Sequence, residues 1–315
     1  MEEIGKIIIV TQKTWLDQLI ERFNTKEQAK FYLEHQGINF SEYLNAHDTY
    51  YSSLREVKRS IPKNQKYQAV EKSFLPNFLF NKDDLVVVLG RDGLVVNTAK
   101  YLDKQPILAL NPDKSRIDGI LLPFDASEFK QQLNVLKNGG ASFNQITLAE
   151  ASLNTGQSII GVNDIFIGHQ SHQSARYVVR FRDLEEQHSS SGIIVSTGLG
   201  STGWYKSILT GALGITNSFR SLDLPPLLEH EFKSPWDANF IHFCVREPWS
   251  SKISGSNIIF GRIYANDTLE VESQMPERGV IFSDGIEQDY LEFRSGTVAK
   301  IFLSEKKTTL VVRQI

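Results

Sequence analysis

The stretch Leu85-Val86-Val87-Val88-Leu89-Gly90-Arg91-Asp92-Gly93 decides the fold. Its five consecutive apolar residues are typical of a strand that is covered on both faces in a parallel sheet, and the run ends at a glycine. Downstream, Val95–Leu102 predicts a helix and Pro106–Leu110 predicts the next strand. This order gives a strand–loop–helix–strand unit, which favours an α/β architecture.

The residues before this stretch extend the same domain. Ile7–Val10 predicts a short buried strand, and Thr14–Phe23 and Lys26–Gln36 carry apolar residues at helical spacing. A mostly helical stretch is expected from there to about Phe80. Residues 1–130 are therefore expected to form a doubly wound α/β domain.

The residues after this domain have a different pattern. From about Gln145, short apolar runs are separated by turns, which indicates a β-rich domain over residues 131–295, with 296–315 returning to the first domain. A helix is expected at Thr202–Leu213, whereas Pro225-Pro226 and Glu229–Asp237 are expected to be loops. The expected strands are Gln145–Glu150, Ile159–Gly168, Ala175–Arg182, Gly192–Ser196, Ile258–Tyr264 and Thr268–Glu272.

Composition excludes several classes of protein. The chain has 315 residues, with 34 Lys and Arg against 37 Asp and Glu, and a formal charge of −3 gives no basic field for general nucleic-acid binding. Its single cysteine, Cys244, allows no intrachain disulfide and no Cys-based zinc site. The amino terminus lacks the basic and long apolar segments of a signal peptide, and no run approaches the roughly 18 apolar residues of a membrane span. We expect a cytoplasmic protein with no nucleic-acid or membrane partner.

The loop after the decisive strand is the first candidate site. Ligands of open parallel sheets bind beyond the carboxyl ends of the strands, where Gly90, Arg91, Asp92 and Gly93 are expected to lie. The two glycines let backbone approach a phosphate closely, and Asp92 can accept a proton from an attacking hydroxyl. The alternative is an ordinary Asp-Gly turn.

A second glycine-rich loop follows the strand at Ile193–Val195. Residues 196–203, which include Gly200, Ser201, Thr202 and Gly203, open the predicted helix, and hydroxyls and free amides at a helix start make an anion site. Ordinary N-capping by Ser201 or Thr202 is the alternative.

Two shorter polar segments complete the candidates. Asn163 and Asp164 stand between apolar strand residues, so they need partners such as ribose hydroxyls or an adenine amine; an edge turn is the alternative. Asp284-Gly285 is typical of a hairpin turn.

These four loops, in this order, resemble the signatures of the NAD kinase family, which shares a superfamily with diacylglycerol and sphingosine kinases. The family signatures are GGDGT, a strand with Asn-Glu, a TGSTAY-type loop and a late Asp-Gly. This chain has Gly90–Leu94, Asn163-Asp164, Gly200–Trp204 and Asp284-Gly285 in their places.

Within the family, the chain looks most similar to the mitochondrial branch, and the resemblance covers most of its length. The residues that carry this closer likeness are Asn111-Pro112-Asp113, Asp118-Gly119, Asn163–Gly168, Ser190-Ser191-Gly192 and Val245–Pro248.

The resemblance implies a role for individual residues. Asp92 matches the catalytic aspartate, and Gly93 matches the glycine beside which NAD passes. Asn163 and Asp164 match the pair that holds NAD. The remaining positions implied to bind NAD are Ser191, where many members have Asp, and Thr202, Gly203 and Ser207.

The implied reaction moves a phosphoryl group from ATP or another donor to the 2′-hydroxyl of NAD. Mg²⁺ is expected to be carried mainly by the donor phosphates, so no residue is predicted to be a dedicated metal ligand. Members of the family are usually dimers or tetramers, which implies a homodimer or homotetramer here.

The first loop departs from the family pattern. Arg91 replaces the second glycine and Leu94 replaces the threonine of GGDGT. Arg91 can clamp a phosphate with two hydrogen bonds, or it can point to solvent and block the usual donor pose. Two alternatives therefore stay open: an NAD- or NADP-binding protein with impaired catalysis, and a lipid or sugar kinase of the same superfamily.

Other residues have simpler interpretations. His169 and His172 have a spacing that can seat a metal, but no third ligand is evident, so we expect a polar surface turn. Trp204 and Trp236 are expected to pack rather than to stack on a base.

Overall fold

The computed structural model describes residues 4–220 and 224–314, and the chain divides into two compact units. Unit 1 comprises residues 1–144 and 308–315, and unit 2 comprises residues 145–307. The sequence pattern placed these boundaries earlier, at 130/131 and 295/296. The first boundary lies later because helix α5 (Phe129–Lys137) buries Phe129, Leu133 and Leu136 in the core of unit 1.

Unit 1 contains a parallel sheet. Its strands lie in the order β17–β4–β3–β1–β2, and β5 pairs with β4. The pairings of β1 with β2 and β3, and of β4 with β3, β5 and β17, are all parallel. Only the last part of β17 takes part, through Thr309 and Leu310. The strands are β1 (Lys6–Thr11), β2 (Tyr67–Glu71), β3 (Asp84–Leu89), β4 (Pro106–Asn111), β5 (Phe124–Asp125) and β17 (Val298–Val312).

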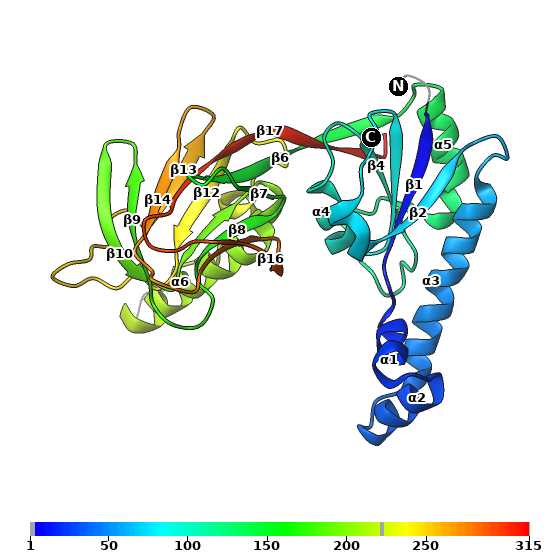
Figure 1. Ribbon diagram of the computed structural model, residues 1–315, viewed down its shortest axis with the longest axis horizontal. Helices are drawn as coiled ribbons and strands as arrows, with labels where there is room; N and C mark the ends of the chain where they lie inside the picture. Colours follow the sequence, from blue (N-terminus) through cyan, green and yellow to red (C-terminus); the bar gives the residue numbers. More distant parts are fainter. Residues whose placement is uncertain (1–3, 221–223, 315) are drawn as a thin grey trace. The chain divides into compact units, whose positions relative to one another are not determined.

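Helices cover both faces of this sheet, as expected for a doubly wound α/β domain (Figure 1). Helices α3 and α5 pack through apolar side chains on the face that carries Ile7, Ile9 and Val87. Helix α4 contacts β3, β4 and the short helix η1. The helices are α1 (Trp15–Phe23), α2 (Lys26–His35), α3 (Phe40–Ser60), η1 (Lys72–Asn77), α4 (Asp92–Ala99), η2 (Ala126–Glu128) and α5.

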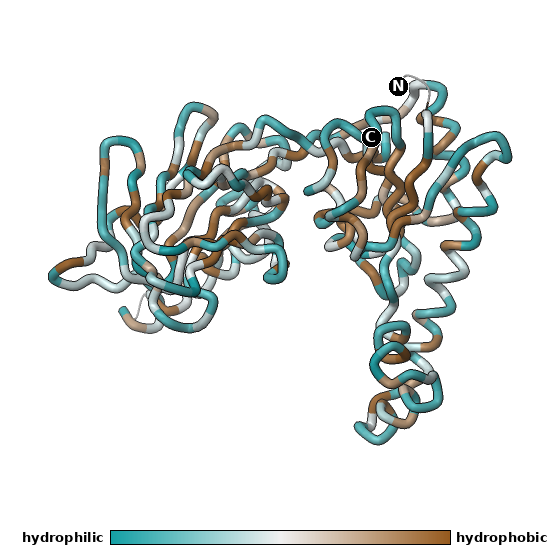
Figure 2. Tube along the Cα trace, in the orientation of Figure 1, coloured by the Kyte–Doolittle hydropathy of each residue, from teal (hydrophilic) through white to brown (hydrophobic). Residues whose placement is uncertain are grey.

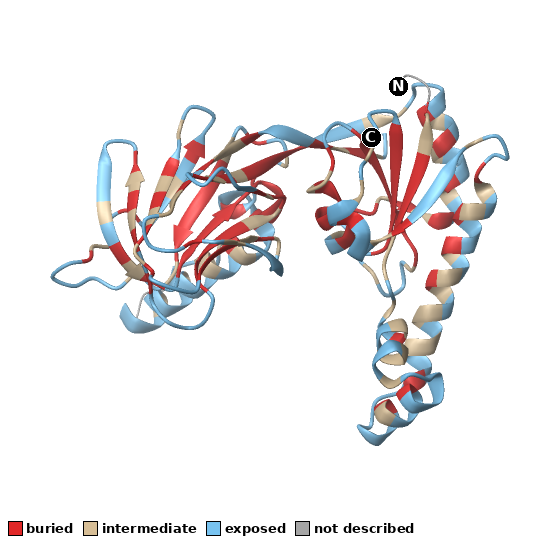
Figure 3. Cartoon of the chain, viewed as in Figure 1, coloured by how far each residue is buried: buried red, intermediate tan, exposed pale blue. Residues whose placement is uncertain are grey.

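One strand of unit 1 was not predicted. The segment up to Phe80 is mostly helical, as expected, through α3 and η1, but Tyr67–Glu71 forms strand β2 beside β1. Only Val70 of this edge strand is buried, so its sequence lacks the apolar run by which β3 was recognised. The central strands carry the apolar residues in Figure 2 and the buried ones in Figure 3.

Unit 2 is β-rich, as predicted, and its core lies between two antiparallel sheets. One sheet has the order β13–β12–β11–β8–β15–β16, and in the other β10, β9 and β14 lead to the first part of β17. Ile167, Val195 and Phe243 of the first sheet pack with Tyr177 and Val271 of the second. The strands are β6 (Ser142–Leu153), β7 (Ser158–Gly161), β8 (Asp164–His169), β9 (Ala175–Phe181), β10 (Leu184–Ser190), β11 (Ile193–Ser196), β12 (Phe240–Val245), β13 (Phe260–Tyr264), β14 (Leu269–Ser273), β15 (Gly279–Ser283) and β16 (Ile286–Glu292).

Helix α6 (Trp204–Arg220) covers the outer face of the first sheet through Trp204 and Ile208. It begins after the short helix η3 (Leu199–Thr202) and is longer than the predicted Thr202–Leu213. The segment Glu229–Asp237, expected to be a loop, contains the one-turn helix α7 (Glu229–Phe232), whose Phe232 is buried.

The segment Ile159–Gly168 is not one strand. It forms β7 and β8, separated by Val162 and Asn163. At this break, the backbone N–H groups of Val162 and Asn163 donate hydrogen bonds to the carboxylate of Asp284 rather than to a neighbouring strand.

Candidate functional site

In unit 1 the candidate loop joins the carboxyl end of β3 to helix α4. Arg91 is the N-cap residue of α4 and Asp92 is its first residue, three positions before the predicted start. The Asp92 carboxylate accepts hydrogen bonds from the backbone N–H groups of Leu121 at 2.9 Å and Ile120 at 3.2 Å. These two bonds fix the orientation of a partly exposed carboxylate at the edge of the sheet where ligands bind.

Gly90 and Gly93 differ in the atoms that a side chain at each position would meet. A methyl group on Gly90 would lie 2.7 Å from the end of the Leu94 side chain, so alanine there would require that side chain to shift. A methyl group on Gly93 would meet no atom within 4 Å, and its backbone is not in the left-handed region. The space beside Gly93 is therefore free for a ligand.

Leu94, which replaces the family threonine, is buried and packs beneath the loop. This position therefore carries no hydroxyl group. Arg91 is exposed, and its guanidinium makes no hydrogen bond or ion pair with the residues that the structure describes.

In unit 2 the structure brings Asn163, Asp164 and the second glycine-rich loop together at one end of the six-stranded sheet. Asp164 begins β8 opposite Ser196, the last residue of β11. The Asn163 carbonyl accepts a hydrogen bond from the Thr197 amide at 2.9 Å. Gly200 packs on the same carbonyl, which would lie 2.0 Å from a methyl group at that position.

The side chain of Asp284 holds this cluster in place. Its carboxylate accepts hydrogen bonds from the N–H groups of Val162, Asn163 and Asp164 at 2.6 to 3.3 Å, while its own N–H donates to the Asp164 carbonyl at 3.0 Å. Asp284 and Gly285 both have positive φ, +56° and +69°, as a two-residue hairpin turn between β15 and β16 requires. Sequence reasoning predicted the turn but missed the role of this carboxylate.

The Asp164 carboxyl group has an unusual pKa. Burial disfavours its charged form, and the nearby Asp284 carboxylate repels a second negative charge, so the pKa of Asp164 is raised to about 7. Near neutral pH, Asp164 is thus present in both protonation states and can donate as well as accept a hydrogen bond.

The hydroxyl groups of the second loop differ in availability. Ser201 is completely buried, donates to the Gly198 carbonyl at 2.6 Å and accepts from the Ser234 amide at 3.0 Å, so its hydroxyl is used inside the loop. This contradicts its expected contact with a phosphate. Thr202 and Gly203 are exposed, and Ser207 is exposed one turn into α6.

Ser191 lies away from the Asn163–Asp164 cluster. It precedes β11, whereas Ser196, opposite Asp164, ends that strand; five residues of strand correspond to roughly 17 Å. Ser191 instead lines a cavity of about 280 Å³ with Trp204 and Arg246. Trp204 stacks on Phe166, with ring centres 5.9 Å apart, as its packing interpretation predicts.

No group of three or more His, Cys, Asp or Glu side chains could hold a metal ion within residues 4–220 and 224–314. His169 is buried rather than at the surface, and its Nδ1 accepts a hydrogen bond from the Ser171 amide at 3.1 Å. Over the same ranges, no helix has both the length and the apolar character needed to cross a membrane.

Comparison with known sequences gives one recurring description. No protein-family model matches the chain. An NAD kinase of Chlorobaculum tepidum is 27% identical over 129 residues, which are 39% of this chain and 44% of that protein. An NAD kinase of Saccharolobus islandicus is 23% identical over 173 residues, 55% of this chain and 61% of that protein. The chain thus spans about half the length of these curated relatives.

Two solved structures share the fold. The yeast NADH kinase complexed with NADH superposes with a TM-score of 0.60 and 15% identity, covering 99% of this chain and 85% of that one. An NAD kinase from Archaeoglobus fulgidus in complex with ATP has a TM-score of 0.54 and 15% identity, covering 97% of this chain and 92% of that one. In sequence and in fold, the chain is therefore similar to the NAD kinase family.

Proposed function

We propose that this chain is an NAD kinase, which transfers the terminal phosphoryl group of ATP or another donor to the adenosine 2′-hydroxyl of NAD(H) and so forms NADP(H). The observation that carries the proposal is the cluster in unit 2, where the Asp284 carboxylate holds Asn163 and Asp164 beside the second glycine-rich loop. The similarity to NAD kinases supports it.

The proposed role of unit 2 is to bind the dinucleotide. The Asn163 amide and the Asp164 carboxyl group are polar, partly buried and available for ribose hydroxyls or an adenine amine. A buried polar group gains most from a partner that matches it, so these two side chains would give the site its selectivity. Thr202, Gly203 and Ser207 would line the same nucleotide.

The proposed role of Asp92 in unit 1 is to accept a proton. As the 2′-oxygen forms a bond to the terminal phosphorus, the bond from that phosphorus to its bridging oxygen breaks. The bridging oxygen leaves with the electron pair, and the hydroxyl proton passes to the Asp92 carboxylate. Its two backbone hydrogen bonds keep one orientation for this transfer. Mg²⁺, carried by the donor phosphates, would neutralise charge there.

A second candidate function is an NAD- or NADP-binding protein with impaired catalysis. The altered first loop favours it, because Leu94 supplies no hydroxyl and Arg91 occupies a position where the family has glycine. A lipid or sugar kinase is less favoured, because the Asn163–Asp164 cluster suits a nucleotide. The closer similarity to the mitochondrial branch, the cytoplasmic location and a homodimer or homotetramer stay predictions.

One assay tests the proposal and its alternative. NADP formation is followed by a coupled enzyme reaction with ATP, GTP and polyphosphate as donors and with NAD and NADH as acceptors, using Asp92→Asn as the matched control. Turnover that Asp92→Asn removes supports the kinase. If NAD stabilises the protein against heat but no donor gives NADP, the non-catalytic binding protein is correct.

The thermal measurement also tests the dinucleotide itself. A ligand at 100 times its dissociation constant adds about 2.7 kcal/mol to the free energy of unfolding. No stabilisation by several millimolar NAD or NADP would contradict both functions.

A further inference from the structure

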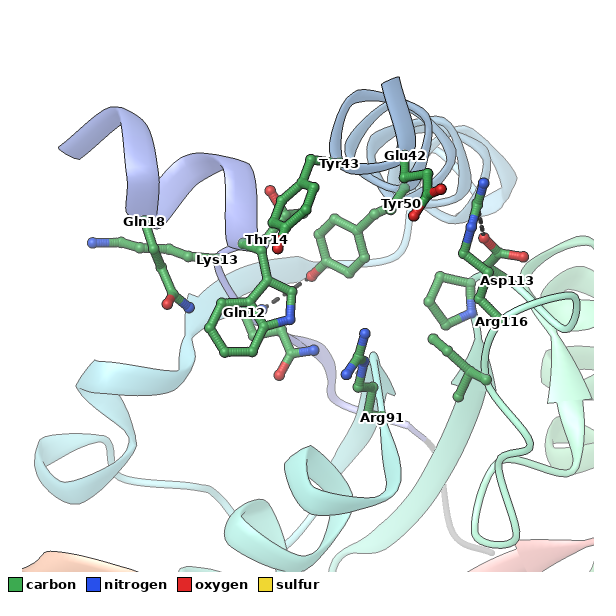
Figure 4. A pocket seen from close by; sticks show the side chains of 14 residues that line it. Gln12, Lys13, Thr14, Gln18, Glu42, Tyr43, Tyr50, Arg91, Asp113 and Arg116 are labelled. Carbon is green, nitrogen blue, oxygen red and sulfur yellow. Dashed lines mark hydrogen bonds and ion pairs between the residues drawn. The ribbon is translucent and has the colours of Figure 1, made fainter. Parts of the chain in front are cut away.

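One cavity of unit 1 lies apart from the first loop. Figure 4 shows the cavity at the carboxyl edge of the parallel sheet, where Arg91 of the first loop reaches toward Tyr50. The other cavity, of about 650 Å³, is formed by helix α3, the segment 61–63 that follows it and the start of helix α5. None of the residues that line this second cavity lines the one at the carboxyl edge. The second cavity therefore needs an explanation of its own.

The walls of the second cavity are held in place from inside the unit. Val57 of α3 and Phe129 of α5 belong to one apolar cluster, which packs the two helices together. Gln65 ties down the segment that follows α3, because its Nε2 donates to the Ile4 carbonyl at 3.2 Å and its Oε1 accepts from the Lys137 ammonium group at 3.0 Å. The cavity is therefore formed before a ligand enters.

Four cations line this cavity, and they come from three segments. Arg55 and Arg59 lie one turn apart on α3, Lys63 follows the helix, and Lys130 belongs to α5. All four are exposed, and within residues 4–220 and 224–314 none of their side chains makes a hydrogen bond or an ion pair. Glu56 is the one acidic residue among the described residues of the lining, and it forms no ion pair with them. Four cations against one acid leave three positive charges unbalanced.

This concentration of positive charge is not a property of the whole chain. The chain has a formal charge of −3, whereas residues 55–66 contain five Lys and Arg and a single acid. Like charges one turn apart weaken a helix. The preference of a last helical turn for cations explains Arg59, but not Arg55 one turn earlier or Lys130 on another helix. An anion bound in the cavity would remove the repulsion between these side chains.

The chemistry of the lining indicates phosphate groups. A guanidinium group binds a phosphate through paired N–H donors, and an ammonium group binds it as a point charge. Ser52 and Ser60 line the same cavity, and their hydroxyl groups have no hydrogen-bond partner in the described part of the chain. One phosphate group carries about 1.5 to 2 negative charges near pH 7, so two of them match the three unbalanced positive charges.

The same lining gives no reason to expect a base. No aromatic side chain is among the described residues that line the cavity, and aromatic rings are the usual platform for a nucleobase. The volume lies within the range of small-molecule sites. A compact anion with several phosphate groups fits better than a nucleotide or a nucleic acid.

We propose that this cavity binds a small molecule that carries at least two phosphate groups, held by Arg55, Arg59, Lys63 and Lys130 without recognition of a base. The site goes beyond the proposed function and does not depend on it, because it shares no residue with the first loop or with the cluster in unit 2. A ligand there is an effector rather than a substrate of the proposed reaction.

The experiment measures binding by calorimetry on the full chain. The probes are inorganic pyrophosphate and inorganic tripolyphosphate, with citrate as the carboxylate probe. Arg55→Gln combined with Arg59→Gln should weaken both phosphate probes by at least tenfold, because charge-assisted contacts are lost. Glu56→Gln should strengthen both by about twofold to fivefold, since it removes a like charge, and misfolding cannot produce such a gain. Citrate should bind at least tenfold more weakly than pyrophosphate.

Matched controls come from exposed residues of unit 1 that do not line this cavity. Lys82→Gln combined with Lys104→Gln also removes two positive charges, and Glu27→Gln on α2 also removes one negative charge. Neither should change the affinity for the phosphate probes. Arg91→Ala reports separately on binding at the first loop, and circular dichroism of each variant excludes misfolding as the cause of a loss.

Each outcome decides for or against the site. Unchanged binding of both phosphate probes by the double arginine variant overturns it, and so does a loss that appears only in Arg91→Ala, because the phosphates then bind at the first loop. An equal loss in the double lysine control shows general attraction and also overturns it. Citrate that binds as tightly as pyrophosphate overturns the phosphate class. A loss in the arginine pair, a gain in Glu56→Gln and unchanged controls support the site, whether or not the chain forms NADP.

Discussion

The raised pKa of Asp164 leads to a prediction about stability against pH. Burial and the Asp284 carboxylate raise its pKa from 3.8 to about 7, so the folded chain binds one more proton here than the unfolded chain between about pH 4 and pH 7. Its contribution to stability is fully present below about pH 4 and is lost as the pH rises through about 7. Asp164→Asn removes this titration.

The magnitude follows from the size of the shift. One proton of difference corresponds to about 1.4 kcal/mol in the free energy of unfolding per pH unit. Between pH 5 and pH 7 the wild-type protein should therefore lose roughly 2 kcal/mol relative to Asp164→Asn. Over the whole window the difference should approach about 4 kcal/mol.

The assay has to report on unit 2 alone. In a Trp15→Phe background, the remaining tryptophans Trp204, Trp236 and Trp249 all belong to unit 2. Urea unfolding followed by their fluorescence at several pH values gives the difference in stability between the chain with Asp164 and the Asp164→Asn variant. Asp183→Asn, at the exposed β9–β10 turn, is the control and should show no such trend. A difference that stays flat from pH 5 to pH 8 would refute the reasoning, because Asp164 would then ionise near its ordinary pKa.

Three further predictions concern the two glycine-rich loops. Asp92→Asn should lower the rate of NADP formation by about 10²–10⁴-fold while NAD affinity measured by calorimetry stays within a few-fold, and a near-native rate would assign the chemistry to another carboxylate. Arg91→Gly restores the family glycine and should lower kcat/KM for ATP in the coupled assay; an equal or higher value would show that Arg91 is passive or obstructive. Gly93→Ala should leave the melting temperature of unit 1 nearly unchanged but weaken NAD binding, whereas Gly200→Ala should lower the melting temperature of unit 2.

The sequence predicted those elements whose cause is local. Leu85–Leu89 is an uninterrupted apolar run, and it forms a strand with every residue buried. Strand β2 was missed because only Val70 contacts the core, so burial leaves little trace in its sequence. Helix α6 was recognised from its spacing, although its end was placed too early.

In the candidate site, too, the sequence identified residues with a local signal but not the contacts between residues far apart in the chain. Asn163 and Asp164 could be selected because two polar residues interrupt a strand, which is unusual without a partner. The contact made by Asp284 could not be predicted from the sequence, because its carboxylate accepts from the Val162 amide, 122 positions earlier in the chain. The raised pKa of Asp164 could not be predicted either, because it depends on the same Asp284 carboxylate lying nearby. Ser201 was misjudged for a similar reason, since its partner Ser234 lies 33 positions away.

Gly93 and Gly200 lie in different signature loops, and a methyl group would meet different surroundings at the two positions. At Gly200 a methyl group would lie 2.0 Å from the Asn163 carbonyl oxygen, a backbone atom that cannot move without disturbing β8 and its bond to Thr197. The cost of alanine there must appear in the folded protein without any ligand. At Gly93 a methyl group meets nothing within 4 Å, and alanine favours helix α4, so the chain alone gives no reason for glycine. Only a molecule that passes beside the loop can make that methyl group costly, and the loss must therefore appear in binding rather than in stability.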